Sequence, residues 1–339
     1  MPAEWEPHAA VWLAWPSAAD LWEDQLRPAQ NSFTAFCHAI ADPNEATGCP
    51  RGETLQVLVP NAEREAEAAR ALNGLGATLH RQPFGDIWLR DTAPLFVETD
   101  RRMVPQVFRV NGWGGKYVLP HDDQVAEAIA GLAGMLPERH DWVLEGGAIE
   151  TDGAGTCLTT RQCLLNRNRN PQLTQVDIEG RLRAAFGFET ILWLDEGLVG
   201  DHTDGHVDNL ARFVGPGRVA CMTPSGSDDP NANLYSTIRD TLAGMKSTDG
   251  RPLEIVDVPS PGRVTDRNGD PVPASSMNFY IANTTVTVPV YDTPYDAAII
   301  EAVQALFPDR RVIGADSRSI LTGGGSFHCI SQQQPAPCI

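Results

Sequence analysis

Apolar positions recur along the chain with two spacings, one typical of buried strands and the other of amphipathic helices. The largely apolar run at residues 55–59 predicts a buried strand, and residues 77–82 predict another strand. Apolar residues three and four positions apart predict helices, and Thr174 is a suitable N-cap for one of them. The predicted helices cover residues 27–41, 63–75, 123–136, 174–186, 231–245 and 294–307.

Turn residues between further strand-like runs predict β-hairpins. Runs 210–214 and 218–222 flank a Gly-Pro-Gly turn, and runs 279–282 and 286–290 flank an Asn-Thr-Thr turn. Counted from the second helix, helix centres lie about 50 to 60 residues apart, which indicates five similar α/β units around an axis. A doubly wound sheet is the alternative, and the hairpins count against it. We expect one domain spanning residues 1–339.

Composition and charge narrow the classes of function. The 339 residues are 42% hydrophobic and 21% charged, as in ordinary soluble globular proteins. No apolar run of about 18 residues and no signal-peptide pattern are found, so we expect neither a membrane span nor secretion. The net charge of −18 disfavours nucleic acid and anionic lipid, because phosphate binding needs clustered Lys and Arg. It is compatible with a cationic small-molecule substrate.

Cysteine usage bears on the cellular compartment. The seven cysteines form no CxxC pair, which argues against a disulfide framework and a zinc knuckle. We therefore expect a cytoplasmic protein, and a homodimer is compatible with the sequence.

Three consecutive glycines at residues 323–325 lead into Cys329. Without Cβ atoms the backbone can approach a ligand and adopt φ values that other residues avoid. A cysteine is a nucleophile only as thiolate, which needs surroundings that lower its pKa from about 8.5. A flexible surface turn and a buried inert thiol are the alternatives. The acidic and histidine-containing motifs elsewhere favour a catalytic Cys329.

The segment at residues 201–208 carries two histidines and three aspartates. In an extended chain His206 and Asp208 point to the same side, where they can serve as proton carrier and cation ligand. A solvated acidic loop is one alternative, and a metal site using His202, His206 and the aspartates is another. Gly205 weakens the metal interpretation because it interrupts any helix that would align the two histidines.

Other acidic and aromatic residues follow predicted strands. Asp91 is a candidate to face a guanidinium or ammonium group beside the aromatic Trp88, and a packed Trp with a surface ion pair is the alternative. Asp86 and Glu145 are further carboxylates at strand ends, and Trp113 is a glycine-flanked aromatic that can line a pocket. If five units surround an axis, these loops converge on one site.

The chemistry of these residues favours a guanidinium substrate. Clustered buried carboxylates raise one another's pKa and are destabilising unless a cation compensates them. A guanidinium is planar, permanently charged and carries five N–H donors, so two carboxylates can hold it. Its carbon is a poor electrophile, and a thiolate is a nucleophile strong enough to displace ammonia from it.

Seven spaced motifs together resemble a known family. They are MPAEWEPHAAVWLAWP at 1–16, WLRDTAP at 88–94, LEGGAIE at 144–150, CLLNRNRNP at 163–171, DGHVD at 204–208, NFYIAN at 278–283 and GGGSFHCISQQ at 323–333. The set resembles the agmatine deiminases, which belong with the bacterial peptidylarginine deiminases to the guanidine-modifying superfamily. The resemblance implies the pentein fold, a five-bladed α/β propeller of pseudo-symmetric ββαβ-type units around a central site.

The resemblance also implies residue roles. Cys329 matches the family's nucleophile, His206 its general acid/base, Asp91 and Asp208 its guanidinium-binding carboxylates, and Glu145 a further active-site acid. The candidate substrate-binding residues are Trp88, Asp86, Asp204, Trp113 and Asn278, the last of which resembles an asparagine near the active site in related deiminases.

The implied activity is hydrolysis of the agmatine guanidinium to N-carbamoylputrescine and ammonia through an amidino-cysteine, a step toward putrescine. A deiminase of peptidyl arginine or another guanidine is one alternative. A metal-dependent amidohydrolase using the 202–208 cluster and a non-catalytic polyamine binder are the others. The expected mechanism requires no metal and no organic cofactor.

Overall fold

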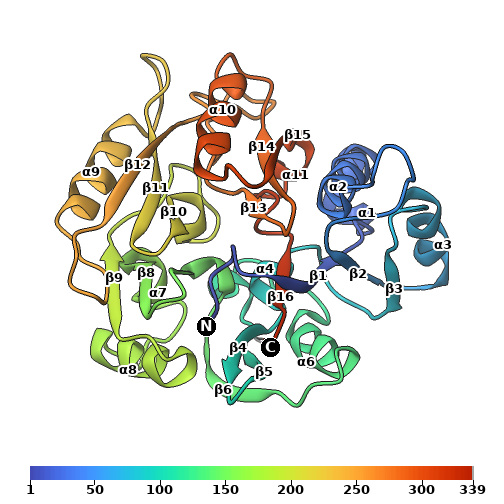
Figure 1. Ribbon diagram of the computed structural model, residues 1–339, viewed down its shortest axis with the longest axis horizontal. Coiled ribbons are helices and arrows are strands. Elements are labelled where there is room, and N and C mark those ends of the chain that lie inside the picture. The colour runs from blue at the N-terminus through green and yellow to red at the C-terminus, as the bar shows by residue number, and fades with distance from the viewer. Residues whose placement is uncertain (338–339) are drawn as a thin grey trace.

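Five small β-sheets are arranged around a common centre in the computed structural model, which describes residues 1–337 (Figure 1). Four sheets have three strands and one has four. The longer helices lie toward the outside of the ring. The five-bladed α/β propeller predicted from the sequence is therefore confirmed.

Four units share the ββαβ order. In each, the first two strands are antiparallel, and a helix leads to a third strand parallel to the second. Their elements are β4 (Leu95–Thr99), β5 (Arg102–Arg109), α6 (Asp122–Leu132) and β6 (Glu138–Val143); β7 (Ile149–Thr151), β8 (Thr156–Thr160), α8 (Gln175–Phe186) and β9 (Thr190–Leu194); β10 (Ala211–Gly215), β11 (Arg218–Thr223), α9 (Ala232–Ala243) and β12 (Glu254–Pro259); β13 (Tyr280–Ile281), β14 (Thr285–Val290), α10 (Asp296–Leu306) and β15 (Arg311–Asp316).

The remaining unit joins the two ends of the chain. Strand β16 (Gln332–Pro335) pairs antiparallel with β1 (His8–Ala14), and β1 pairs parallel with β2 (Thr54–Val59) across α2 (Leu26–Ala41). Topologically, α2 is thus the equivalent of the other four crossover helices. Counting from the second predicted helix was wrong for this unit, because α3 (Ala62–Ala71) leads only to an additional edge strand, β3 (Thr78–Arg81).

Neighbouring units share their apolar faces. Helix α10 buries Ile299, Val303 and Leu306 on one side, and it packs on β15 of its own sheet and on β12 of the preceding one. Helix α2 likewise packs on β14. These shared cores hold the ring together. Within residues 1–337 no helix has the length and apolar character needed to cross a membrane.

The predicted helices and hairpins are present, with shifts at some ends. Thr174 caps α8 through a capping box with Asp177, as its position predicted. Helices α3 and α6 end earlier than predicted, at Ala71 and Leu132, because Gly74 and Gly134 follow with φ values of 85° and 70°.

Short helices connect the larger elements and shape the centre. They are α1 (Ala19–Trp22), η1 (Glu23–Gln25), α4 (Leu89–Thr92), α5 (Gly112–Gly115), η2 (Gly146–Ala148), α7 (Arg161–Leu164), η3 (Val207–Asn209) and α11 (Arg318–Leu321). Of these, α4, η2 and η3 each stand just before the first strand of a unit.

Candidate active site

Residues just before the first strand of every unit meet at one place. Their contacts join all five units: His206 contacts Glu145 and Asp91, while Asn278 contacts Asp208 and Cys329. The predicted convergence of strand-end loops is therefore observed. A pseudo-symmetric ring brings equivalent positions of its units together, which explains how residues so distant in sequence form one site.

The sulfur of Cys329 lies against Asn278 and Asp208. Its Sγ is 3.1 Å from Asn278 Nδ2 and 3.6 Å from Asp208 Oδ2, and its backbone N–H donates to Asn278 Oδ1 at 3.2 Å. Burial, and after it the carboxylates of Asp208 and Asp91, raise the pKa of the thiol well above its usual value. A positive charge must therefore enter the site before the thiol can ionise readily.

The glycines before Cys329 allow the indole of Trp88 to pack against this loop. A Cβ atom at Gly323 would lie 2.6 Å from Trp88 Cζ2, and one at Gly325 would lie 2.7 Å from Trp88 Cζ3 and 3.1 Å from Cys329 Sγ. The glycine run thus serves close packing around the thiol. Only Gly324 also has a positive φ, of 102°.

Two buried carboxylates, Asp91 and Asp208, approach the thiol with different partners. Asp91 accepts hydrogen bonds from Trp113 Nε1 at 2.8 Å and from the Gly147 N–H at 3.0 Å, and burial raises its pKa. Burial also opposes ionisation of Asp208, but the hydrogen bond and charge of His328 outweigh it and lower the pKa. Asp208 Oδ1 has no hydrogen-bond partner among residues 1–337.

The imidazole of His206 and both carboxylates surround Gly147. A Cβ atom there would lie 2.5 Å from His206 Nδ1 and 3.1 Å from each of Asp208 Oδ2 and Asp91 Oδ1. The expected extended arrangement of His206 and Asp208 was wrong, because the intervening residues form the single turn η3. His206 and Asp208 nevertheless both lie beside Gly147.

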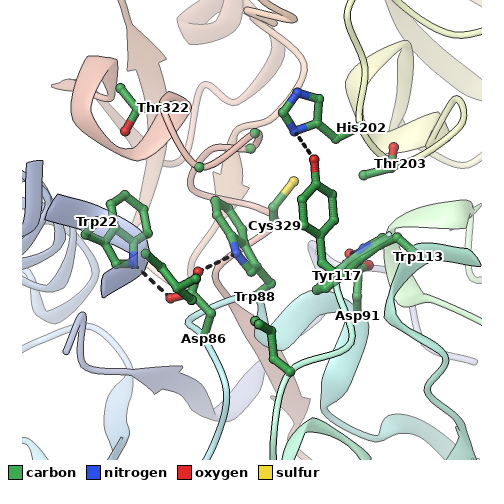
Figure 2. Close-up of a pocket in the computed structure, with 15 residues that line it drawn as sticks. Trp22, Asp86, Trp88, Asp91, Trp113, Tyr117, His202, Thr203, Thr322 and Cys329 are labelled. Carbon is green, nitrogen blue, oxygen red and sulfur yellow. Dashed lines mark hydrogen bonds between the residues drawn. The ribbon is translucent and has the colours of Figure 1, made fainter. Parts of the chain in front are cut away.

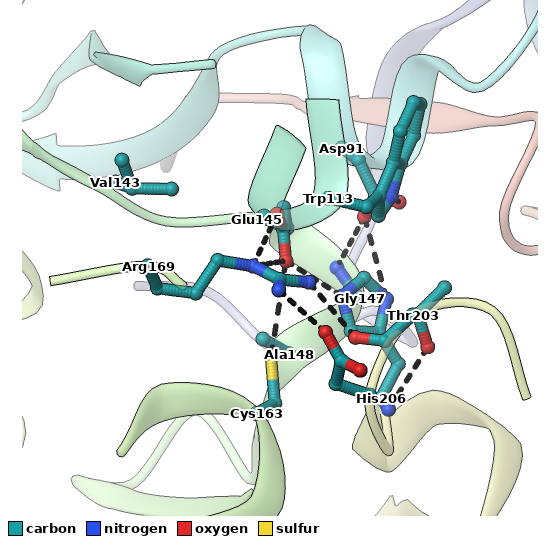
Figure 3. Close-up of polar contacts among 12 residues, drawn as sticks. Asp91, Trp113, Val143, Glu145, Gly147, Ala148, Cys163, Arg169, Thr203 and His206 are labelled. Carbon is teal, nitrogen blue, oxygen red and sulfur yellow. Dashed lines mark hydrogen bonds and ion pairs between the residues drawn. The ribbon is translucent and has the colours of Figure 1, made fainter. Parts of the chain in front are cut away.

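A chain of ion pairs leads from His206 toward the surface (Figure 3). His206 Nε2 is 3.0 Å from Glu145 Oε2, Arg169 Nε is 2.8 Å from Glu145 Oε1, and Arg169 Nη1 is 2.7 Å from Asp204 Oδ2. Lys116 Nζ completes the chain 2.8 Å from Asp204 Oδ1. Although burial opposes it, the charge of Asp91 and the hydrogen bonds to Cys163 and Glu145 raise the pKa of His206 well above its usual range. The imidazole is therefore held as a proton donor.

These ion pairs do not agree with the predicted role of Asp204 as a substrate-binding residue. Its carboxylate is bound by Lys116, Asn168 and Arg169 and is not among the residues lining the cavity described below. Asp204 therefore supports Glu145 through Arg169 instead of contacting substrate. Arg169 was not predicted from the sequence, although a buried carboxylate such as that of Glu145 needs a cation beside it.

Replacing Arg169 with methionine should lower the free energy of unfolding by about 3–5 kcal/mol, because Glu145 would be left buried without its cation. Urea denaturation measures this loss. Lys116→Met is the matched control. It removes a partly exposed cation from the same series of ion pairs and should lower the free energy of unfolding by less than about 1 kcal/mol. Equal losses for the two variants would contradict the importance of the buried pair.

A second buried network, also missed, supports Asp208. His328 lies with Nδ1 2.7 Å from Asp208 Oδ2 and Nε2 2.8 Å from Glu4 Oε2. Arg212 pairs with both Glu4 and Glu150, at 2.8 and 3.0 Å. His328 could have been predicted as a site residue because it directly precedes Cys329. Nothing in the sequence indicated Glu4.

A cavity of about 220 Å³ leads to the sulfur of Cys329 (Figure 2). Its walls are aromatic and acidic, and the predicted residues Asp86, Trp88, Asp91 and Trp113 all line it. Asn278 and Asp208 instead contact the thiol without lining the cavity. The remaining lining residues are Leu21, Trp22, Tyr117, Leu119, His202, Thr203, Thr322, Gly323, Gly324 and Gly325.

The metal site considered for residues 202–208 is not formed. His202 Nδ1 lies 3.2 Å from the hydroxyl of Tyr117, and within residues 1–337 the only group of three potential ligands is Glu145, Cys163 and His206. Glu145 in that group is already engaged by Arg169. The arrangement instead combines a thiol, an imidazole and two carboxylates, which suits nucleophilic attack on a planar cation.

Comparisons with known proteins agree with this chemistry. Residues 1–335 match the model of the Porphyromonas-type peptidyl-arginine deiminases. Agmatine deiminases of Ectopseudomonas mendocina and Pseudomonas aeruginosa are each 38% identical over 361 residues, covering 99% of this chain and 95% of the relative. A solved agmatine deiminase of Enterococcus faecalis is 32% identical with a TM-score of 0.91, covering 100% of this chain and 96% of that one. The predicted pentein fold is confirmed, and the chain belongs to the Porphyromonas-type peptidyl-arginine deiminase family.

Proposed function

We propose that this chain is an agmatine deiminase, which hydrolyses the guanidinium of agmatine to N-carbamoylputrescine and ammonia. The observation that carries the proposal is a cavity ending at Cys329, beside which His206 Nδ1 and Asp208 Oδ1 are buried without hydrogen-bond partners in the described chain. Buried polar atoms are rarely left unpaired, so these atoms point to a ligand. The names of the relatives support agmatine as that ligand.

Substrate binding brings a positive charge to the thiol of Cys329 and to the carboxylates beside it. The guanidinium lies between Asp91 and Asp208, each of which accepts N–H hydrogen bonds from it. Its charge offsets the burial and the carboxylate repulsion that together raise the pKa of Cys329, so the thiolate forms when substrate is present. The nucleophile is therefore activated by the molecule it attacks.

The reaction then proceeds in two steps. The sulfur of Cys329 bonds to the guanidinium carbon, His206 gives its proton to one amino nitrogen, and that carbon–nitrogen bond breaks to release ammonia. The remaining amidino group stays bound to sulfur. Water attacks the same carbon and gives one proton to His206. The carbon–sulfur bond then breaks, the departing sulfur takes the remaining hydroxyl proton, and the ureido product leaves. Glu145 orients the imidazole in both steps.

A comparative assay tests the proposal against its alternatives. Ammonia and ureido product should form from agmatine at least about tenfold more efficiently than from arginine or a blocked arginine peptide, since the preferred substrate makes contacts that the others lack. Faster turnover of the peptide would favour a peptidyl-arginine deiminase. Loss of activity on chelation would favour the metal-dependent alternative, and binding of agmatine without ammonia release would leave a polyamine binder.

A further inference from the structure

The cavity presents two carboxylates on different sides of Trp88. Figure 2 shows Asp86 on the side of Trp22 and Asp91 on the side of Trp113. Asp91 belongs to the group around Cys329, whereas Asp86 has no part in the proposed chemistry. The described lining residues include no Lys or Arg. The cavity therefore offers negative charge in two separate places.

Asp86 is held by neutral donors alone. Its Oδ1 accepts from Trp22 Nε1 and its Oδ2 from Trp88 Nε1, both at 2.9 Å, and within residues 1–337 it forms no ion pair. The side chain is only 6% exposed. Burial raises its pKa because the charged form lacks a compensating cation. The two indoles hold the carboxylate at the cavity wall while leaving its charge unneutralised.

A second acidic residue lies close behind Asp86. Asp122 accepts a hydrogen bond from the Gly85 N–H at 2.8 Å, and burial together with the charge of Asp86 raises its pKa to about 6. No cationic side chain pairs with Asp122 in the described chain. This end of the cavity therefore adds further negative potential, which favours a cation there.

We propose that Asp86 binds the distal ammonium group of a dicationic substrate, whose guanidinium lies at Asp91 and Asp208. The inference rests on the proposed function and extends it from one end of the substrate to the other. The aromatic walls formed by Trp88 and Trp113 suit the apolar methylene chain between the two charges. Asp86 is then the residue that selects for substrates with a positive charge at both ends.

This assignment predicts discrimination against other guanidines. Arginine carries an α-carboxylate near its ammonium group, and that carboxylate would face Asp86 without a cation to bind it. An arginine within a peptide chain has a neutral amide in place of the ammonium group. Agmatine has neither, so it pairs both of its charges with carboxylates of the cavity.

The test compares agmatine with n-pentylguanidine, in which a methyl group replaces the ammonium group. In the unaltered enzyme kcat/KM for agmatine should exceed that for n-pentylguanidine at least about tenfold, the effect of one charge-assisted contact. Asp86→Asn should lower this ratio at least about fivefold, because the amide keeps the shape but loses the charge. Trp22→Phe removes one indole donor and keeps the charge, so the ratio should stay within about twofold of the unaltered value.

Three outcomes overturn the inference while leaving the proposed function in place. The first is an unaltered enzyme that turns over both compounds equally well, a measurement that needs no variant. The second is an equal loss for both substrates in Asp86→Asn, which would show that Asp86 only positions Trp22 and Trp88. The third is a ratio that collapses in Trp22→Phe as far as in Asp86→Asn. If the unaltered enzyme releases no ammonia from agmatine, the proposed function itself fails.

Discussion

Replacing Cys329 with alanine is expected to abolish ammonia release from agmatine while agmatine still binds. No other thiol lines the described cavity, so the loss in kcat should reach at least about 10⁴-fold. Binding should persist because Asp91 and Asp208 remain to hold the guanidinium. Calorimetry with agmatine measures the affinity, and an ammonia assay measures turnover.

The chain provides a matched control for this substitution. Cys49 is exposed and does not line the cavity, so Cys49→Ala should turn over agmatine at the unaltered rate. Acid quenching of the unaltered enzyme during turnover, followed by peptide mass spectrometry, should find the amidino adduct on Cys329. Retained ammonia release by Cys329→Ala, or an adduct on Cys163, would overturn the assignment of the nucleophile.

A single methyl group at Gly147 is expected to reduce kcat/KM at least about 10²-fold. The added Cβ atom would stand 2.5 Å from His206 Nδ1 and close to both guanidinium-binding carboxylates, so at least one of these groups must move. Misplacement of a reacting group by about 1 Å has an effect of this size. The φ angle of Gly147 is not positive, so steric contact alone accounts for the loss.

Gly180→Ala is the control for Gly147→Ala. Gly180 lies in α8, nothing lies within 4 Å of a Cβ atom added there, and alanine favours a helix over glycine by about 1 kcal/mol. It should leave activity unchanged and raise the melting temperature slightly. Near-normal kinetics for Gly147→Ala, with the fold intact by circular dichroism, would contradict the position given to His206.

Much of the site was predictable because its chemistry is local to short motifs. Cys329, His206, Asp91 and Glu145 each stand in a loop after a recognisable strand. The spacing of the helices predicted five units, although it counted α3 in place of α2. What failed was local geometry: the turn η3 replaced the expected extended segment at Asp208. The conformational propensities of three residues are too weak to distinguish a single helical turn from an extended segment.

The supporting residues depended on contacts that sequence patterns do not contain. His328 meets Glu4, its partner 324 positions away, only because β16 pairs with β1 and closes the ring. Arg169 reaches Glu145, 24 positions away in the sequence, from the loop between α7 and α8. Asp204 has the residue type of a substrate ligand, and only the tertiary structure shows its carboxylate paired with Lys116 and Arg169.

The amino-acid sequence by itself determined the fold class, the number of units and the chemical types of the candidate reacting groups, because periodicity, turn chemistry and side-chain reactivity are properties of short segments. Only the tertiary structure decided which charges face one another across the centre. Those distances set the raised pKa of Cys329 and of His206, and they leave Asp86 without a cation. Electrostatic energies depend on separation and burial, and both exist only once the ring has closed.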